Sequence, residues 1–304
     1  MSTEETKPEL LERPRSTELD KILGQSFPVL DEGFVRVVDY MGTDSSVLQA
    51  ARVSYGTGIK TRTEDEALIR FMMRHGHTSP FEHCSIKFHI KVPMDCWRQW
   101  IRHRTAKVNE YSTRYSVAID STQATPSNQW RLQSKSNKQC SGDYFSEEIG
   151  KSLSFEEAQL HAMSRSVYEK RLQVGVAKEQ ARKDLPLSTY TETYWTMDLH
   201  NLLHFLRLRM DKHAQKEIRD YANVIGDIVK MWCPLSWQAF EEYQRNSMRL
   251  SKTEQYLITQ KINNGDIQSD LVACGWITFA EDGLAKESTE YKEFKTKLES
   301  LGLK

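Results

Sequence analysis

The sequence predicts a chain of mixed α/β (α+β) class, and three observations lead to that prediction. Residues 85–92 alternate strictly between apolar and polar side chains, which is the pattern of a half-buried strand. Residues 188–197 are rich in β-branched and aromatic side chains, which favour strands. Residues 199–210 and 214–232 instead repeat their apolar side chains at helical spacing. Strands and long helices therefore follow one another along one chain.

The composition limits the classes of protein. The 304 residues, enough for one large domain or two small ones, carry 42 basic and 42 acidic side chains, so no global charge favours nucleic acid. The five cysteines form no C-x-x-C pair, which indicates a reduced, cytoplasmic setting. Residues 1–19 lack the apolar core of a signal peptide, and no stretch of about 18 apolar residues is present. We therefore expect neither a nucleic-acid partner nor a membrane span.

The N-terminal part is expected to contain an extension, a strand and a helix. Residues 1–25 are rich in Glu, Lys, Pro and Ser and are interpreted as a loosely held extension. Residues 33–40 are expected to form the first strand. Residues 45–54 are expected to form a helix, with an apolar side made of Val47, Ala50, Ala51 and Val53.

A better-defined helix is expected over residues 63–74. Thr63 and Glu66 form a capping-box pattern at its start, and Gly76 supplies its stop. Its core face is expected to consist of Ala67, Leu68, Phe71 and Met72.

Three histidines, His75, His77 and His83, crowd the connection that follows this helix. Their spacing could supply an H-x-H…H metal site. Histidines beside Gly76 and Pro80 could equally satisfy backbone groups in a tight turn. A third interpretation is a loop that lays His77 and Ser79 against a bound cofactor. The residues alone leave these interpretations open.

The stretch 98–116 is the most unusual part of the sequence. A helix that begins at Pro93 is expected to carry Trp97 and Trp100 and to give way to a loop near Asn109. Six cationic or imidazole side chains face a single acid, Glu110, and they are Arg98, Arg102, His103, Arg104, Lys107 and Arg114. Because guanidinium groups match phosphate geometry, the stretch predicts a site for an anionic ligand. The alternative is a basic surface strip that does nothing or touches nucleic acid.

Residues 121–145 are polar, with little periodicity, and are interpreted as a long insertion loop. Trp130, Arg131 and Gln133 could give it a role in covering a site. A plain surface loop is the alternative.

Helices and one strand are expected beyond the insertion. Ser154 and Glu157 form a capping pattern for a helix over 154–173, and a short helix at 177–183 carries Arg182. After the strand at 188–197, Asp198 has the character of a helix cap.

Arg209, and His213 if that helix continues, fall beside its apolar side and would need partners. An internal carboxylate or a ligand could serve Arg209, and the residues alone favour the carboxylate.

The C-terminal region differs in character. After helices at 214–232 and 237–243, residues 247–304 are charged and weakly periodic, with expected helices at 251–262 and 288–301. We interpret 246–304 as a C-terminal extension that lies outside the site.

Several common chemistries have no motif here: G-x-G-x-x-G, the P-loop, H-E-x-x-H and G-x-S-x-G are missing, and no cysteine has an activated setting. Arginine holds phosphates and stabilises negative charge but makes a poor base. The residues therefore suit a phosphorylated substrate and a cofactor that performs the difficult chemistry. Two other classes remain: a metal-dependent phosphohydrolase built on His75, His77 and His83, and a nucleic-acid-binding module built on the basic stretch.

The segment RHRTAKVNEYSTRYS at 102–116 resembles the signature R-H-R-x-x-S-x-N-E-x-S-x-R of the flavin-dependent thymidylate synthases, the ThyX family. Seven positions match: Arg102, His103, Arg104, Asn109, Glu110, Ser112 and Arg114. Lys107 stands where the signature has its first serine. The resemblance extends to RHGHTSPFEH at 74–83, RKDLPL from Arg182, and LRLRMDKHAQKEI at 206–218.

The resemblance implies an activity and an architecture. These enzymes methylate dUMP to dTMP with carbon from 5,10-methylenetetrahydrofolate and with NADPH as reductant acting through FAD, and they use no cysteine nucleophile. Residues 26–245 would form the enzyme domain, in which helices surround a central mixed or antiparallel sheet. The assembly would be a homotetramer with active sites where subunits meet.

The resemblance also implies roles for individual residues. Arg209 would activate dUMP by favouring ionisation at N3 of the uracil. The residues implied to bind dUMP are Gln99, Trp100, Ile101, Arg102, Glu110, Tyr111, Ser112, Thr113, Arg114, Arg182 and Arg209. Those implied to bind FAD are His77, Ser79, Arg102, His103, Arg104, Glu110, Asp198, Leu199, His200 and His204. No metal is implied.

Overall fold

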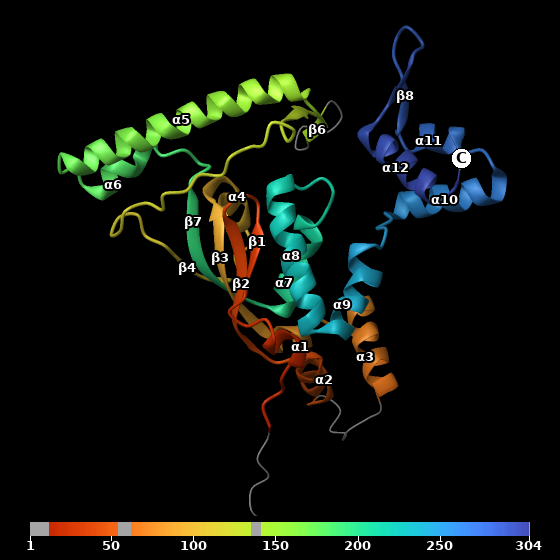
Figure 1. Ribbon diagram of the computed structural model, residues 1–304. Coiled ribbons are helices and arrows are strands. Elements are labelled where there is room, and N and C mark those ends of the chain that lie inside the picture. Colours follow the sequence, from red (N-terminus) through yellow and green to blue (C-terminus); the bar gives the residue numbers. More distant parts are fainter. Residues whose placement is uncertain (1–11, 54–61, 135–140, 304) are drawn as a thin grey trace, which may run out of the picture. The chain divides into compact units, whose positions relative to one another are not determined.

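Figure 1 shows a computed structural model of the chain, which describes residues 12–53, 62–134 and 141–303. The side chains of Arg62 and Thr63 lie outside the described part, and with them the capping box expected at Thr63. The chain divides into two compact units, residues 1–245 and 246–304. Each unit has its own hydrophobic core.

The first unit is built on a five-stranded antiparallel sheet, so the predicted mixed α/β class is confirmed. In spatial order the strands are β1 (Ser26–Val29), β2 (Gly33–Met41), β3 (Ser85–Pro93), β7 (Tyr190–Asp198) and β4 (Lys107–Glu110). The predicted strands at 33–40, 85–92 and 188–197 are thus β2, β3 and β7. The short β1 was not predicted.

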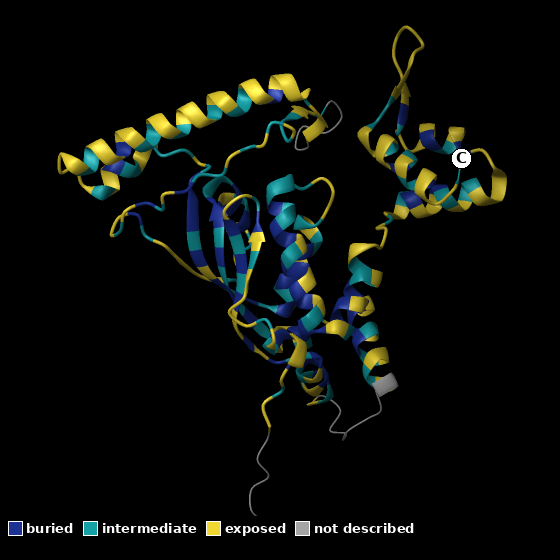
Figure 2. Cartoon of the chain, in the orientation of Figure 1, coloured by how far each residue is buried: buried dark blue, intermediate teal, exposed yellow. Residues whose placement is uncertain are grey.

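One face of the sheet carries the core. The alternating apolar side chains of β3 are fully buried, and they are Ile86, Phe88, Ile90 and Val92. Helices α7 (Leu199–Arg209) and α8 (Lys216–Trp232) contribute the facing layer, whose buried positions appear dark blue in Figure 2. Trp100 packs edge-on against Trp195 of β7 at 5.3 Å between ring centroids, and its ring is tilted against that of Phe205 of α7 at 4.9 Å. The predicted period-two pattern therefore sets the inner face of the sheet.

Two regions predicted as irregular are ordered by contacts distant in sequence. Residues 107–110, expected to leave the helix as a loop, form the edge strand β4, because β7 offers an unpaired edge on that side. Part of the expected loose extension is also anchored: α1 (Thr17–Asp20) buries Leu19, and the hydroxyl of Ser16 donates to the carbonyl of Met231 at 3.0 Å. Both predictions were wrong for these residues.

The faces of two predicted helices also need correction. In α3 (Arg62–His75), Ile69, Met72 and Met73 are buried, whereas the expected core residues Ala67 and Phe71 are exposed. Phe71 lies instead against the rings of His75 and His77, at 4.5 and 5.6 Å. In α2 (Asp44–Val53) the expected apolar residue Val53 is exposed at the C-terminal end, and Leu48 is buried.

The insertion contains a β-hairpin, not only a loop. Strands β5 (Arg131–Gln133) and β6 (Ser141–Tyr144) pair antiparallel, and residues 135–140 between them lie outside the described residues. The following helix, α5 (Glu147–Gln173), begins seven residues earlier than predicted, with Ser146 as its cap. Ser154 instead donates to the carbonyl of Thr125 at 2.6 Å and accepts from Trp130 at 2.9 Å. The predicted cap residue thus ties the insertion to the helix.

Short helices complete the first unit. They are η1 (Ser79–His83), α4 (Met94–Trp100), α6 (Lys178–Ala181), η2 (Arg182–Asp184), α9 (Pro234–Phe240) and the π-helical turn η3 (Glu241–Arg245). The α7 helix ends at Arg209, so His213 does not continue along its apolar side as considered from the sequence.

The second unit is a small domain with its own core. Its elements are α10 (Lys252–Asn264), α11 (Gln268–Ala273), β8 (Ile277–Phe279), β9 (Ala285–Glu287) and α12 (Thr289–Ser300). Ser251 and Glu254 form a reciprocal capping box at the start of α10. Leu257, Phe294 and Leu298 belong to the buried cluster. In the part of the chain that the structure describes, no helix has both the length and the apolar composition needed to cross a membrane.

Candidate active site

The basic stretch begins where α4 ends. Trp97 and Trp100 are buried and anchor this helix in the core, whereas Arg98 on the same helix is exposed. Arg102 and Arg104 follow in the exposed turn between α4 and β4. Neither forms a salt bridge with a described residue. Two guanidinium groups without a carboxylate partner make this turn suited to an anionic ligand.

Arg209, the last residue of α7, lies half-buried beside this turn. Its Nε donates to Nε2 of His103 at 3.1 Å, and its Nη2 donates to the carbonyl of Gln99 at 3.4 Å. The internal carboxylate favoured from the residues alone is therefore wrong among the described residues, because the partners are an imidazole and a carbonyl. Burial lowers the pKa of Arg209 from its usual value.

His103 is held neutral by its surroundings. Burial first, and then the charges of Arg209 and His204, lower its pKa to about 4. Since arginine can only donate, Nε2 of His103 must accept, and the ring proton resides on Nδ1. The His103 ring also packs edge-on against Phe205 at 4.9 Å. His103 therefore orients Arg209 without adding a positive charge at neutral pH.

Glu110, the acid of the basic stretch, is held at the end of β4. Its carboxylate accepts from Nε1 of Trp97 at 2.9 Å and from the hydroxyl of Thr191 at 2.9 Å. The pairing of β4 with β7 brings Thr191 to it. One strand pairing thus fixes the position of this carboxylate next to the arginines.

The turn that follows β4 presents the remaining residues of the signature. Ser112 accepts backbone bonds from Tyr115 and Ser116, which closes the turn. Thr113 is buried and accepts from Nη1 of Arg182 at 2.6 Å, so η2 and the turn lie together. Arg114 pairs with Glu179 at 3.3 Å, with both side chains more than half exposed. The structure thereby brings Arg182 to the segment 111–114, seventy residues away in sequence.

The predicted cofactor residues lie along α7 and η1. Asp198 caps α7 by accepting from the amide of Asn201 at 2.9 Å, which confirms the predicted cap. His204 lies near His103, at 6.0 Å between ring centroids, and His200 lines a small pocket together with His77. His77 and Ser79 also line a pocket of about 360 Å³ with Phe71, Met72 and His83. The small pocket thus links η1 to α7, and the ring contact links α7 to the turn at His103.

The side chains of Trp100 and Leu199 do not reach the surface of this site. Both are fully buried and pack into the core beneath it. Ile101 and Tyr111 are exposed, and Tyr111 donates through its hydroxyl to the carbonyl of Val117 at 2.8 Å.

The histidines do not form a metal centre within the described residues, where no group of three or more His, Cys, Asp or Glu side chains is arranged to hold an ion. The rings of His75 and His77 are 6.4 Å apart, with Phe71 against both.

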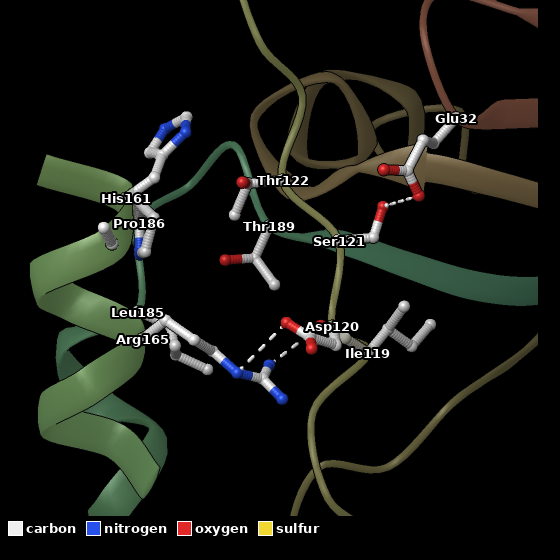
Figure 3. Close-up of a pocket in the computed structure, with 11 residues that line it drawn as sticks. Glu32, Ile119, Asp120, Ser121, Thr122, His161, Arg165, Leu185, Pro186 and Thr189 are labelled. Atoms are coloured by element: carbon white, nitrogen blue, oxygen red, sulfur yellow. Dashed lines mark hydrogen bonds and ion pairs between the residues drawn. The ribbon is translucent and has the colours of Figure 1, made fainter. Parts of the chain in front are cut away.

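Two further pockets were not predicted. One, of about 250 Å³, lies between α5 and the start of β7 and is lined by Glu32, Asp120, His161, Arg165 and Thr189, among others (Figure 3). It contains no residue predicted for the site. The other, of about 490 Å³, is lined by Asp95, Arg131, Gln215 and Glu217 among others. Two of its lining residues, Gln215 and Glu217, lie in the block at 206–218 that resembles the family. That block is the sequence feature that could have indicated this pocket.

The antiparallel sheet, the two arginines without a described salt-bridge partner and the neutral histidine beside Arg209 define an α+β enzyme that binds an anionic substrate. The family described as "Thymidylate synthase complementing protein" matches residues 36–235. The chain belongs to the flavin-dependent thymidylate synthase family.

Curated relatives with that name include those of Wolbachia pipientis wMel, 52% identical over 82% of this chain and 88% of the relative, and Treponema denticola, 47% identical over 80% and 92%. Among solved structures, the UMP/dUMP methylase PolB from Streptomyces cacaoi, bound with 5-Br dUMP, superposes with a TM-score of 0.66. It is 28% identical and covers 72% of this chain and 99% of its own.

Proposed function

We propose that this chain is a methyltransferase that converts dUMP to dTMP, with 5,10-methylenetetrahydrofolate as carbon donor and NADPH as reductant through FAD. Family membership supports the reaction and the flavin. The observation that carries the proposal for the site is the half-buried Arg209, which lacks a described carboxylate partner and lies beside the turn of Arg102 and Arg104, neither of which pairs with a described acid. A cationic cluster of this kind suits a nucleotide monophosphate.

Arg209 acts on the base. His103 and the carbonyl of Gln99 hold its guanidinium, so its orientation is set before substrate arrives. A fixed positive charge beside the uracil stabilises negative charge at N3, and the ionised ring is a better nucleophile at C5. Because His103 is neutral, the side chain that holds the Arg209 guanidinium adds no positive charge of its own.

The turn after β4 binds the rest of the nucleotide. Ser112 and Arg114 lie on the turn, and the Arg182–Thr113 hydrogen bond fixes a third group next to them. Hydroxyl and guanidinium donors together match the acceptor oxygens of a phosphate. Glu110 orients this turn through Trp97 and Thr191.

The chain's residues fit a flavin along α7. The 360 Å³ pocket at η1 presents the ring of Phe71 and the thioether side chain of Met72 beside His77 and Ser79, and the exposed Arg102 and Arg104 can meet a pyrophosphate. His77, Ser79, His200, His204 and the 102–104 turn would hold it. When bound, FAD supplies the redox chemistry, passing reducing equivalents from NADPH.

No described cysteine is placed to act as nucleophile at this site. Cys96, the nearest in sequence to the arginines, is fully buried, and burial first, then nearby carboxylates, raises the pKa of its thiol. Cys84 and Cys233 are also buried. Burial also raises the pKa of Cys233, so the thiols of Cys96 and Cys233 do not form the thiolate that a nucleophile needs.

A homotetramer in the cytoplasm, with sites where subunits meet, completes the proposal. In support, α5 extends over 27 residues yet buries only Gly150 and Tyr168 among them, and Figure 2 shows its surface largely exposed. Its exposed apolar side chains at helical spacing include Ile149, Leu160, Met163 and Val167. Such a stripe is typical of a helix that packs against another chain.

The test is to follow dTMP while purified protein is supplied with FAD, NADPH and 5,10-methylenetetrahydrofolate, with and without dUMP. We expect dTMP only when all four are present, and no loss on adding a chelator. Flavin binding without dTMP formation would reject dUMP as the substrate. Chelator-sensitive phosphate release without flavin would support the histidine phosphohydrolase instead.

A further inference from the structure

Gln99 lies in a hydrogen-bonded chain that leads away from the candidate nucleotide site. Its side-chain Nε2 donates to Oε1 of Gln215, the residue that precedes α8. Nε2 of Gln215 in turn donates to Oδ2 of Asp95 at 3.3 Å, on the first turn of α4. The backbone carbonyl of Gln99 meanwhile accepts from Arg209. Two elements far apart in sequence therefore hold one side chain beside the activating arginine.

The chemistry of the groups in this series of hydrogen bonds fixes which group donates and which accepts. An ionised carboxylate such as Asp95 can only accept hydrogen bonds, so Gln215 must turn its NH₂ group toward Asp95. Its Oε1 then faces Gln99, which must offer its own NH₂ group. The remaining polar atom, Oε1 of Gln99, is left as an acceptor. The Glu217 carboxylate also accepts a hydrogen bond from the Gln215 side chain. The two carboxylates together thus set the orientation of both amides and leave Oε1 of Gln99 as an acceptor for a ligand.

The insertion hairpin, β5 and β6, supports this series of hydrogen bonds. Nη2 of Arg131, on β5, contacts both carboxylate oxygens of Glu217 at 2.8 and 2.9 Å, and both side chains are largely buried. Glu217 is on the first turn of α8, two residues after Gln215. Arg131, Glu217, Gln215 and Asp95 all line the 490 Å³ pocket. The hairpin therefore holds the start of α8, and with it Gln215. We call the series of hydrogen bonds from Asp95 through Gln215 to Gln99 the relay.

We propose that Asp95 and Gln215 are positioning residues, which fix the amide of Gln99 so that its oxygen accepts a hydrogen bond from the bound nucleotide. This inference rests on the proposed function, since it takes dUMP as the ligand. The matching groups on dUMP are the donors of the uracil ring and the deoxyribose. A ligand that presents an acceptor at the same place is disfavoured, because two acceptors meet.

Three variants of the full-length, FAD-loaded protein test the direction of the relay. Gln215→Lys can only donate, so it forces Gln99 to turn its NH₂ group toward the nucleotide. Asp95→Asn can donate or accept, so it weakens the orientation of Gln215 and leaves only Glu217 to fix it. The double variant Asp95→Asn with Gln215→Glu places a carboxylate acceptor opposite Gln99 and keeps the original direction.

Isothermal titration with dUMP gives the dissociation constant of each variant, and steady-state kinetics separates KM from kcat. We expect Kd to rise about tenfold or more for Gln215→Lys and about two- to threefold for Asp95→Asn, with the double variant within about twofold of the parent. KM should follow Kd, and kcat should change less. Asp227→Asn, the same substitution at an exposed position of α8, is the matched control and should leave Kd unchanged.

The outcomes are separable. Equal Kd values for the parent and Gln215→Lys, or equal losses in the double variant and Gln215→Lys, overturn the relay. A lower melting temperature with unchanged Kd shows a structural role only and also overturns it. If the parent binds dUMP but forms no dTMP, the proposed function fails while the Kd series still decides the relay. If the parent does not bind dUMP, both fail.

Discussion

Arg209 combines its proposed catalytic role with a structural one, because it closes α7 and contacts both His103 and Gln99. We expect Arg209→Ala to retain FAD and to lower turnover by about 10²- to 10³-fold, since a preoriented charge at the reacting base is removed. Flavin absorbance and dTMP formation measure the two effects.

Arg245→Ala, which removes only a surface pair with Glu241, serves as the control for Arg209→Ala and should keep normal turnover. Near-normal turnover in Arg209→Ala would rule out its activating role.

Ser112 is expected to bind the nucleotide and not to act as a nucleophile. It lies on the turn after β4, where its backbone carbonyl closes the turn and its hydroxyl accepts only a long bond, 3.4 Å, from the amide of Arg114. We expect Ser112→Ala to raise the dUMP Kd about tenfold, with residual turnover, since a hydroxyl that bonds a charged phosphate is removed. Complete loss of turnover with normal dUMP binding, measured by titration and single-turnover assay, would contradict this.

His103 links pH to stability. Its pKa is about 4 in the folded chain, below its ordinary value of 6.5, so the unfolded chain takes up the proton first as pH falls. The contribution of neutral His103 is therefore present above pH 6.5 and is lost progressively down to about pH 4. We expect the free energy of unfolding to fall less between pH 7 and 4.5 in His103→Asn than in the parent chain. Urea unfolding at both pH values checks this, and identical losses would show that His103 is not the titrating group.

At the scale of elements, the hairpin β5–β6 is joined to α8 by one ion pair. Burial raises the pKa of Glu217, but hydrogen bonds from Arg131, from its own backbone amide and from Gln215, together with the charge of Arg131, outweigh it and hold that pKa below its usual value. Glu217 also benefits from its place in the first turn of α8. The pair therefore stabilises both elements.

We expect Arg131→Ala to lower the free energy of unfolding by about 3 kcal/mol, because it leaves the Glu217 carboxylate buried and unpaired. Urea unfolding measures the loss, and Arg131→Ala combined with Glu217→Gln should recover part of it. Arg114→Ala, which breaks a pair exposed on both sides, is the comparison and should cost less than about 1 kcal/mol. Equal losses at the two sites would mean that burial does not set the strength of the Arg131–Glu217 pair.

At the scale of the whole molecule, the two units have separate cores, and residues 246–304 contain none of the proposed site residues. We expect a chain that ends at Arg245 to fold, to bind FAD and to form dTMP within about threefold of the full chain, since no core residue of the first unit is removed. Circular dichroism, flavin absorbance and the dTMP assay test this. Loss of flavin in a folded chain would assign the C-terminal unit a part in the site.

The sequence by itself determined those features that depend on residue type and short spacing. The alternation in 85–92 predicted β3, and Asp198 predicted the start of α7. The match at 102–116 indicated the family, and with it the enzyme class and the flavin. These signals are local, because a strand face, a helix cap and a binding signature each depend on residues within about a dozen positions of one another.

Only the tertiary structure decided the features that depend on contacts between distant segments. β4 is a strand because β7 has a free edge, and Phe71 is exposed because it meets His75 and His77 instead of the sheet. Arg209 has His103 and the Gln99 carbonyl as partners, where its own sequence neighbourhood favoured a carboxylate. Asp95 and Gln215, 120 positions apart, meet through a single hydrogen bond. Such pairings leave no local periodicity, since packing of separate segments creates them.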